Sequence, residues 1–388
     1  MWVVLAAVVV AVPLAPELGW TPASLDRASR IGQLNELLAY AVAILGLNVV
    51  VGCSGQLSLG QSAFVGLGAY TTVILVADHG WSWFAALPVA VAVCLAVGLV
   101  IGWPVSRIEG PYLAIATLAM AYVFPALVLR FESLTGGTNG KGPRRGEGRL
   151  RPPSWLPFAD EGRLARSLWV FCILVALAAA AFWTARAVVR SRPGRALVAV
   201  RDHRLGAVAS GVHVARARAA AFALSAAYGG LAGGMLMLDR PFATDGQFGT
   251  RLTLLLVVGL VVGGVGTIAG ALPGAAVLVF VPYYVGQWTD DHRGLPPVLR
   301  HVLGPVFERL RPAGTSAATI LFGGALLLTV FVMPGGIADG VRRLTARVVT
   351  VVGPPPWLGE PAADGGIRRA AATRRVPPSS RRTAGSRR

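Results

Sequence analysis

The sequence predicts an all-α membrane protein with about ten transmembrane helices. Of its 388 residues, 54% are hydrophobic and only 14% are charged, and the mean hydropathy is +0.62. Soluble domains carry roughly a quarter charged residues. Apolar runs of about 17 to 25 residues recur along the chain, enough to cross a hydrocarbon core about 30 Å thick. Glycine pairs spaced four apart within these runs predict helices that pack closely.

Eight apolar runs are expected to form one span each: 2–18, 34–51, 57–77, 83–103, 111–130, 168–186, 219–238 and 317–333. The first has no basic segment before it and no good cleavage site after it, so we expect a weak span rather than a removed signal. The run 252–286 is too long for one helix, and its central glycines with Pro273 predict a break into two short helices, either two spans or a re-entrant pair. Ten helices would place both termini on one side.

Arginine and lysine in short loops indicate which side faces the cytoplasm. Segment 187–218 has seven arginines against one acid, and the chain from 339 onward has eleven against three, so both are expected in the cytoplasm. Loop 131–167 must then be external, although it carries seven basic residues against four acids. We expect a permease domain over 1–352 and a disordered basic cytoplasmic tail over 353–388, because the tail's composition cannot bury a core. Its arginines predict attraction to anionic lipid and, without interleaved aromatics, no nucleic-acid binding.

Small residues spaced four apart share one helix face, where two backbones can approach closely. Helix-packing roles are therefore predicted for a set of glycines: Gly66, Gly229, Gly233, Gly259, Gly263, Gly266 and Gly270. A gating role for these segments is a further possibility, and the abundance of glycine, 48 residues in all, is the simplest alternative.

Residues 194–211 are expected to form one basic amphipathic helix, with Pro193 before it and Gly211 after it. Its apolar face would carry Leu197, Val200, Leu205, Val208 and Val212. Such a helix lies in the membrane interface or seats itself in a groove of a soluble partner. A solvated charged loop against anionic lipid is the alternative.

The segment GRALVAVRDHRLGAVASGVHVARARAAAFALSAAYGGLAGGM, 194–235, resembles the coupling region and following helix of the LivM-type permeases, subunits of ABC importers for branched-chain amino acids. Further stretches resemble the same family in the same order: GLNVVVGCSGQLSLGQSAFVGLGAY at 46–70, IEGPYLAIATLAMAY at 108–122, LTGGTNG at 134–140, GGVGTIAGALPGAAVL at 263–278 and MPGGI at 333–337. The resemblance covers residues 34–337.

The resemblance implies a multi-pass subunit of the cytoplasmic membrane that pairs with a second, LivH-like permease. Two cytoplasmic ABC ATPases would drive it, and an extracytoplasmic binding protein would deliver the substrate near loop 131–167. The chain contains no GxxxxGK[ST] phosphate loop, so we expect no bound cofactor and ATP hydrolysis by the partner subunits. The expected substrate is a branched-chain or related amino acid, with urea or a short amide as the alternative.

The resemblance also implies an ATPase-coupling role for five residues: Gly194, Arg195, Arg201, Asp202 and Gly211. One departure stands out. The family usually carries a glutamate in the coupling segment before the glycine matched by Gly211, where this chain has Val208 and Ala209. Either the ATPase partner compensates for this difference, or coupling is weaker here.

Polar residues gather around the second, third and fifth predicted helices: Asn48, Gln56, Ser58, Gln61, Ser62, Tyr112 and Thr117. Polar groups at membrane depth either line a cavity or are packed inside protein. We therefore predict a substrate pathway along these residues, with interhelical hydrogen bonding as the alternative.

Other classes of protein fit the sequence less well. An ion-coupled secondary transporter would normally place an ionisable residue within a span, whereas Glu36, Asp78, Asp239 and Arg251 are expected at helix ends. A membrane enzyme would need a catalytic constellation, and none is present. Neither a disulfide framework nor a metal site is predicted from the three cysteines, Cys53, Cys94 and Cys172, or from the five histidines, His79, His203, His213, His292 and His301.

Overall fold

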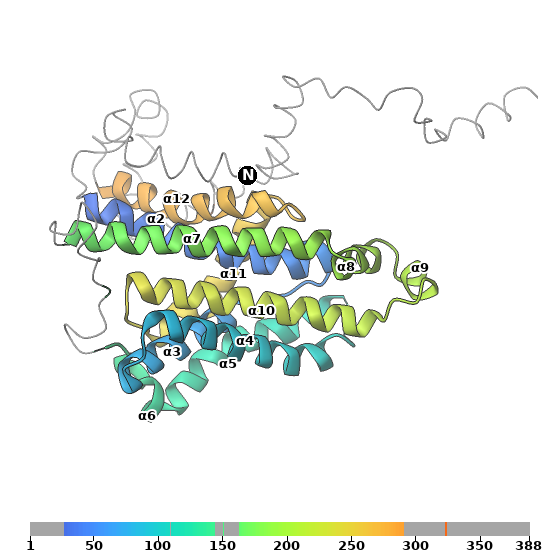
Figure 1. Cartoon of the computed structure of the whole chain (residues 1–388), viewed down its shortest axis with the longest axis horizontal. Coiled ribbons are helices and arrows are strands. Elements are labelled where there is room, and N and C mark those ends of the chain that lie inside the picture. The colour runs from blue at the N-terminus through green and yellow to red at the C-terminus, as the bar shows by residue number, and fades with distance from the viewer. Residues whose placement is uncertain (1–26, 109, 144–149, 151–162, 291–322, 324–388) are drawn as a thin grey trace, which may run out of the picture. The chain divides into compact units, whose positions relative to one another are not determined.

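The computed structural model describes residues 27–108, 110–143, 150, 163–290 and 323, and these form a bundle of helices (Figure 1). Seven helices in this part of the chain are long and apolar enough to cross a membrane. The predicted all-α, multi-span fold class is therefore confirmed. The predicted span 2–18, the predicted span 317–333 apart from residue 323, and the tail 353–388 lie outside the described residues. The predicted count of ten helices depends on these segments.

The long helices follow the predicted apolar runs. Their bounds are α2 (Arg27–Asn48), α3 (Gln61–His79), α4 (Trp83–Val105), α5 (Pro111–Arg130), α7 (Arg163–Arg190), α10 (Val214–Asp239), α11 (Thr250–Gly263) and α12 (Ala271–Asp290). A π-helical turn, η1 (Val49–Cys53), continues α2. Short 3₁₀ turns η3 (Asp245–Phe248) and η4 (Ile268–Gly270) precede α11 and α12.

Local chemistry sets several of these bounds. Helix α5 has Pro111 in its first turn, where the missing N–H costs nothing. The Ser82 side chain accepts a hydrogen bond from the Ala85 amide and so caps the start of α4. Helix α3 ends at Gly80, whose left-handed backbone (φ 65°) lets its N–H bond the Leu75 carbonyl.

Helix α10 is the buried centre of the bundle and packs against α2, α3 and α4. Its glycines allow this approach. A Cβ at Gly233 would collide with the Val65 backbone of α3, and one at Gly230 would collide with Cys94 of α4. Gly229 similarly faces Phe64. Close van der Waals contact of this kind holds helices together where lipid offers no hydrophobic driving force.

The run 252–286 forms two helices, α11 and α12, that pack against each other. Gly259 and Gly263 of α11 lie against the Gly270–Gly274 stretch, with no room for a Cβ at Gly263. The chain reverses between the helices through Gly264 (φ 110°) and Gly266 (φ 81°), conformations that favour glycine. Gly266 thus belongs to the turn, whereas Gly66 in α3 packs against Phe124 and Phe248.

Two predictions of local structure are wrong. Residues 194–211 form two short helices, α8 (Arg192–Asp202) and α9 (Arg204–Ala209), because His203 is extended (φ −151°, ψ 92°) and caps α9 through Nδ1. The break changes the helical phase, so Leu205 and Val208 are exposed instead of continuing the buried face of Leu197 and Val200.

Glu36 also lies elsewhere in its helix than predicted. The structure begins α2 at Arg27, seven residues before the predicted start at residue 34. The first residues of α2 are polar and precede the apolar run, so the run alone does not mark where the helix begins. Glu36 therefore lies more than two turns inside the helix and within a candidate span, not at a helix end.

Helices α8 and α9 lie at one end of the bundle, and the short helix α6 (Glu132–Thr135) lies at the other (Figure 1). We call these the α8 end and the α6 end. At the α6 end the 3₁₀ turn η2 (Gly137–Asn139) leads to Lys141, which forms an antiparallel backbone bridge with Ala243 and an ion pair of 2.8 Å with Asp78. These contacts join the predicted external loop to α3 and to the segment after α10.

Candidate functional site

Arg201 connects α8 to the end of α2. Its Nη1 donates a hydrogen bond of 2.5 Å to the Gly52 carbonyl oxygen in the π-helical turn, and its Nε contacts Asp202 Oδ1 at 3.0 Å. The last carbonyls of a helix have no partner within the helix, and a cation there also interacts favourably with the helix dipole. Arg201 therefore supplies a hydrogen-bond donor to a carbonyl at the end of α2, from a segment that is distant in sequence.

Asn48, one turn before Gly52, connects α2 to the reversal between α11 and α12. Its Nδ2 donates to the Thr267 carbonyl at 2.8 Å, and its Oδ1 accepts from the Gly266 amide at 2.8 Å. A Cβ at Gly266 would also lie 3.5 Å from Arg201 Nη1. Arg201, Gly52, Asn48 and the Gly266–Thr267 turn thus form one cluster, which we call the α8–α2–α11 junction.

The five predicted coupling residues occupy different positions. Gly194 is buried against the Val188–Val189 backbone at the end of α7, with no space for a Cβ. Arg195 is exposed and donates to the Arg190 carbonyl at 2.8 Å, and Asp202 is exposed beside Arg201. Gly211 forms a left-handed turn (φ 81°) after α9, in open space. Gly194 and Arg195 thus contact the end of α7, and Arg201 joins α8 to the end of α2.

Helix α9 presents an exposed apolar surface at the tip of the α8 end. The side chains of Leu205 and Val208 are 76% and 54% exposed, while Ala207 between them is buried. Isolated exposed apolar residues are common, but these two share a short helix held outside the main bundle. Both side chains are therefore accessible at the α8 end.

Among the predicted pathway residues, Gln61 joins three helices. From the first turn of α3, its Nε2 donates to the carbonyls of Ala43 in α2 and Ser225 in α10, each at 3.2 Å. Its Oε1 accepts a hydrogen bond of 3.0 Å from Ser225 Oγ. Gln61 is only 1% exposed, so this network satisfies a polar group that would be costly to leave unpaired.

The other members of the group make similar contacts between segments. Thr253 Oγ1 donates to Ser62 Oγ at 2.6 Å, the Leu59 amide donates to Thr117 Oγ1 at 2.8 Å, and Gln56 Nε2 donates to the Arg218 carbonyl at 3.2 Å. Ser58 is buried, whereas Tyr112 is 75% exposed. Five cavities in this part of the chain have linings that include none of the seven predicted pathway residues.

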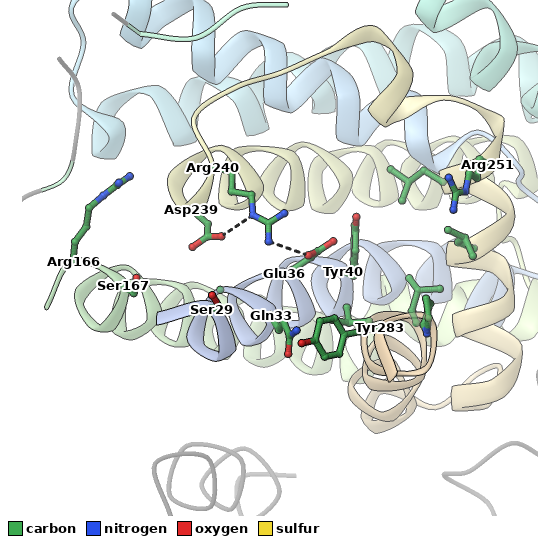
Figure 2. A pocket seen from close by; sticks show the side chains of 16 residues that line it. Ser29, Gln33, Glu36, Tyr40, Arg166, Ser167, Asp239, Arg240, Arg251 and Tyr283 are labelled. Atoms are coloured by element: carbon green, nitrogen blue, oxygen red, sulfur yellow. Dashed lines mark ion pairs between the residues drawn. The ribbon is translucent and has the colours of Figure 1, made fainter. Parts of the chain in front are cut away.

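A cavity with a volume of about 1110 Å³ lies toward the α6 end, where α2 and α7 begin (Figure 2). Helices α2, α7, α10, α11 and α12 form its walls. Its polar lining comprises Ser29, Gln33, Glu36, Tyr40, Arg166, Ser167, Asp239, Arg240, Arg251 and Tyr283, and its apolar lining includes Leu252, Leu255, Leu278 and Val279. Sequence reasoning missed this site, because these residues come from five separate runs and only the tertiary fold brings them together.

Charges of both signs face one another in the cavity. Arg240 lies between two acids, with Nη2 3.8 Å from Glu36 Oε2 and Nε 3.7 Å from Asp239 Oδ2 (Figure 2). Asn35 Nδ2 donates to the other oxygen of Asp239 at 2.6 Å. Arg251, at the start of α11, reaches the cavity from the opposite direction (Figure 2). No group of three potential metal ligands occurs among the described residues, and Cys53, Cys94 and Cys172 are not paired with one another.

Residues 31–332 match the family described as branched-chain amino acid transport system / permease component. The chain is 30% identical over 255 residues to the "High-affinity branched-chain amino acid transport system permease protein LivM" of Escherichia coli (strain K12), and equally to its namesake in Salmonella typhimurium. Each alignment covers 62% of this chain, which spans 60% of the length of these relatives. No solved structure matches the chain.

Proposed function

The chain belongs to the family of permease components of branched-chain amino acid transport systems, and from this premise we propose that it is a permease subunit of an ABC importer for branched-chain or related amino acids. It would lie in the cytoplasmic membrane with both termini in the cytoplasm. In this orientation the α8 end faces the cytoplasm and the α6 end faces outward.

Separate ATPase subunits would supply the energy, since the sequence has no phosphate loop of its own. The exposed Leu205 and Val208 of α9 offer these subunits an apolar contact at the α8 end. The observation that carries the proposal is the hydrogen bond from Arg201 to Gly52. A displacement of α8 by an ATPase would pull directly on the end of α2 and, through Asn48, on the α11–α12 turn.

Other surfaces suit the remaining partners. An apolar groove of about 430 Å³, lined by α3, α4, α5 and α6 and including Phe64, Met120 and Phe124, fits a second membrane-spanning permease. The Lys141 bridge organises part of loop 131–167 at the α6 end, where a substrate-binding protein would dock. The basic tail, residues 353–388, would lie against anionic lipid.

The test is to replace Arg201 with Gln in the full chain, assembled with its partner subunits, and to measure ATP hydrolysis with and without substrate-loaded binding protein. We expect substrate stimulation to fall severalfold while assembly is retained. Arg192→Gln, an exposed arginine on the same helix, is the matched control and should behave like the wild type. Full stimulation in the Arg201 variant would exclude this contact from coupling.

A further inference from the structure

We propose that the cavity at the α6 end is a binding site for an α-amino acid zwitterion, with Arg251 receiving the carboxylate and Glu36 the ammonium group. This inference rests on the proposed function as an amino acid permease, because it assigns a substrate contact to that role. The cavity combines groups of both charges with an aliphatic wall, and these three features match the three parts of a branched-chain amino acid.

Arg251 is the anion-binding group. It is the second residue of α11, it is exposed, and it forms no ion pair with any described residue although two carboxylates line the same cavity. A guanidinium presents its N–H groups in a planar fork that binds a carboxylate through two parallel hydrogen bonds. A cation retained at the end of an apolar helix without an acidic partner is therefore available to a ligand.

Glu36 is the cation-binding group. It lies inside α2, within a candidate membrane span, and its side chain is 30% exposed. An ionisable group in a span carries a desolvation cost and typically marks a ligand or ion site. Its ion pair is weak, because the separation from Arg240 is 3.8 Å and Arg240 is 70% exposed. The Tyr40 hydroxyl also contacts the Glu36 carboxylate, but as a neutral group it leaves the negative charge uncompensated. An incoming ammonium could replace Arg240, which would keep its contact with Asp239 at 3.7 Å.

The remaining wall is apolar. Leu252 and Leu255 come from α11, and Leu278 and Val279 come from α12. Ligand sites usually combine such a lining with a few polar groups that fix the orientation. Because the volume of about 1110 Å³ slightly exceeds the roughly 300–1,000 Å³ of typical ligand pockets, the amino acid would bind together with water in an outer vestibule.

The experiment measures protection of a cysteine in the cavity, in membrane vesicles containing the full chain with its outer side accessible. Gln33, which lines the cavity, is changed to Cys in a Cys172→Ser background, since Cys172 is exposed and the other two cysteines are buried. The rate of modification by a charged thiol reagent is then measured against leucine concentration. We expect leucine to slow it more than 4-methylpentanoate or isopentylamine, which each lack one charge.

Arg251→Gln should raise the half-protecting leucine concentration by about tenfold or more, as expected for the loss of a charge-assisted bidentate contact. Arg251→Lys should restore part of the affinity, and Glu36→Gln should abolish the preference for leucine over 4-methylpentanoate. Arg130→Gln, an exposed arginine at the end of α5 outside the cavity, is the matched control and should leave protection unchanged.

Absence of leucine protection, or equal protection in the wild type and Arg251→Gln, would overturn the site. ATP-driven leucine uptake by the assembled transporter separates this failure from failure of the proposed function. Leucine uptake without protection of the cysteine would rule out the cavity site and leave the proposed function standing. Protection without uptake supports the site and counts against the transport role.

Discussion

Gln61 and Ser225 join α3 to α10 through two hydrogen bonds, one in each direction, of 3.2 and 3.0 Å. The two residues are 164 positions apart in sequence and both are buried. Because Gln61 also donates to Ala43 of α2, one carboxamide connects the three helices that include the buried centre of the bundle.

Ser225→Ala should destabilise the protein by about 1 kcal/mol, because Gln61 Oε1 loses its donor and interhelical hydrogen bonds in membranes contribute roughly 0.6–1.7 kcal/mol. The measurement is unfolding of the purified protein in mild detergent as denaturant is added. Ser210→Ala, at the exposed residue that follows α9, is the control and should stay within about 0.5 kcal/mol of the wild type. If stability were unchanged and uptake impaired, the pathway interpretation of Gln61 would be favoured over the interhelical one.

Asn48→Ala should weaken substrate-stimulated ATP hydrolysis in the same way as Arg201→Gln, since both residues belong to the α8–α2–α11 junction. The losses of stimulation caused by Asn48→Ala and Arg201→Gln should not add in the double variant, because residues that act through one network are coupled by about 0.5–3 kcal/mol. The double variant is therefore expected to resemble the more impaired single variant. Independent, additive losses would show that the two contacts do not form one linkage.

Gly233→Ala should destabilise the bundle by about 1–3 kcal/mol, in the range observed for overpacked cores. The added Cβ would meet the Val65 carbonyl oxygen, which is backbone and cannot rotate away, so α10 and α3 would have to separate. Gly246→Ala is the matched control, because nothing lies within 4 Å of a Cβ at that position. Thermal unfolding of the two variants compares them directly, and equal melting temperatures would contradict this packing.

Lys141→Ala should cost less than about 1 kcal/mol, because its ion pair with Asp78 is partly exposed and its backbone bridge to Ala243 remains. Ala243→Pro should cost more, since proline removes the N–H that donates to the Lys141 carbonyl at 2.8 Å. Unfolding in low and high salt distinguishes the two contributions. The ion pair's contribution to the free energy of unfolding should decrease in high salt, and the contribution of the backbone hydrogen bond should not.

Sequence patterns predicted the helices best where local chemistry marks both ends. The predicted span 111–130 has the bounds of α5, since Pro111 marks its start and Arg130 its end. The pattern failed at His203, because the apolar spacing on either side looks continuous while the extended backbone at this one residue changes the helical phase. It also failed at Glu36, because a helix can extend beyond its apolar run.

The candidate site was harder to predict than the fold. Arg201 was singled out from its resemblance to a family pattern, but its acceptor is a backbone carbonyl 149 residues away. A carbonyl carries no signature in a sequence. Glu36 and Arg251 were noted individually as charges beside apolar runs, and only the packing of α2 against α11 and α12 brings them to one cavity.

The π-helical turn Val49–Cys53 has a geometrical consequence. A π turn contains about one residue more than an α turn, so residues after it are rotated by about 100° relative to an uninterrupted helix. If residues are assigned to helix faces with uninterrupted α-helical spacing across Asn48–Ser54, the assignment is therefore wrong by one position after the turn. The extra residue lies at the end of an apolar run, within the turn whose Gly52 carbonyl accepts the hydrogen bond from Arg201, and hydropathy alone would not register it.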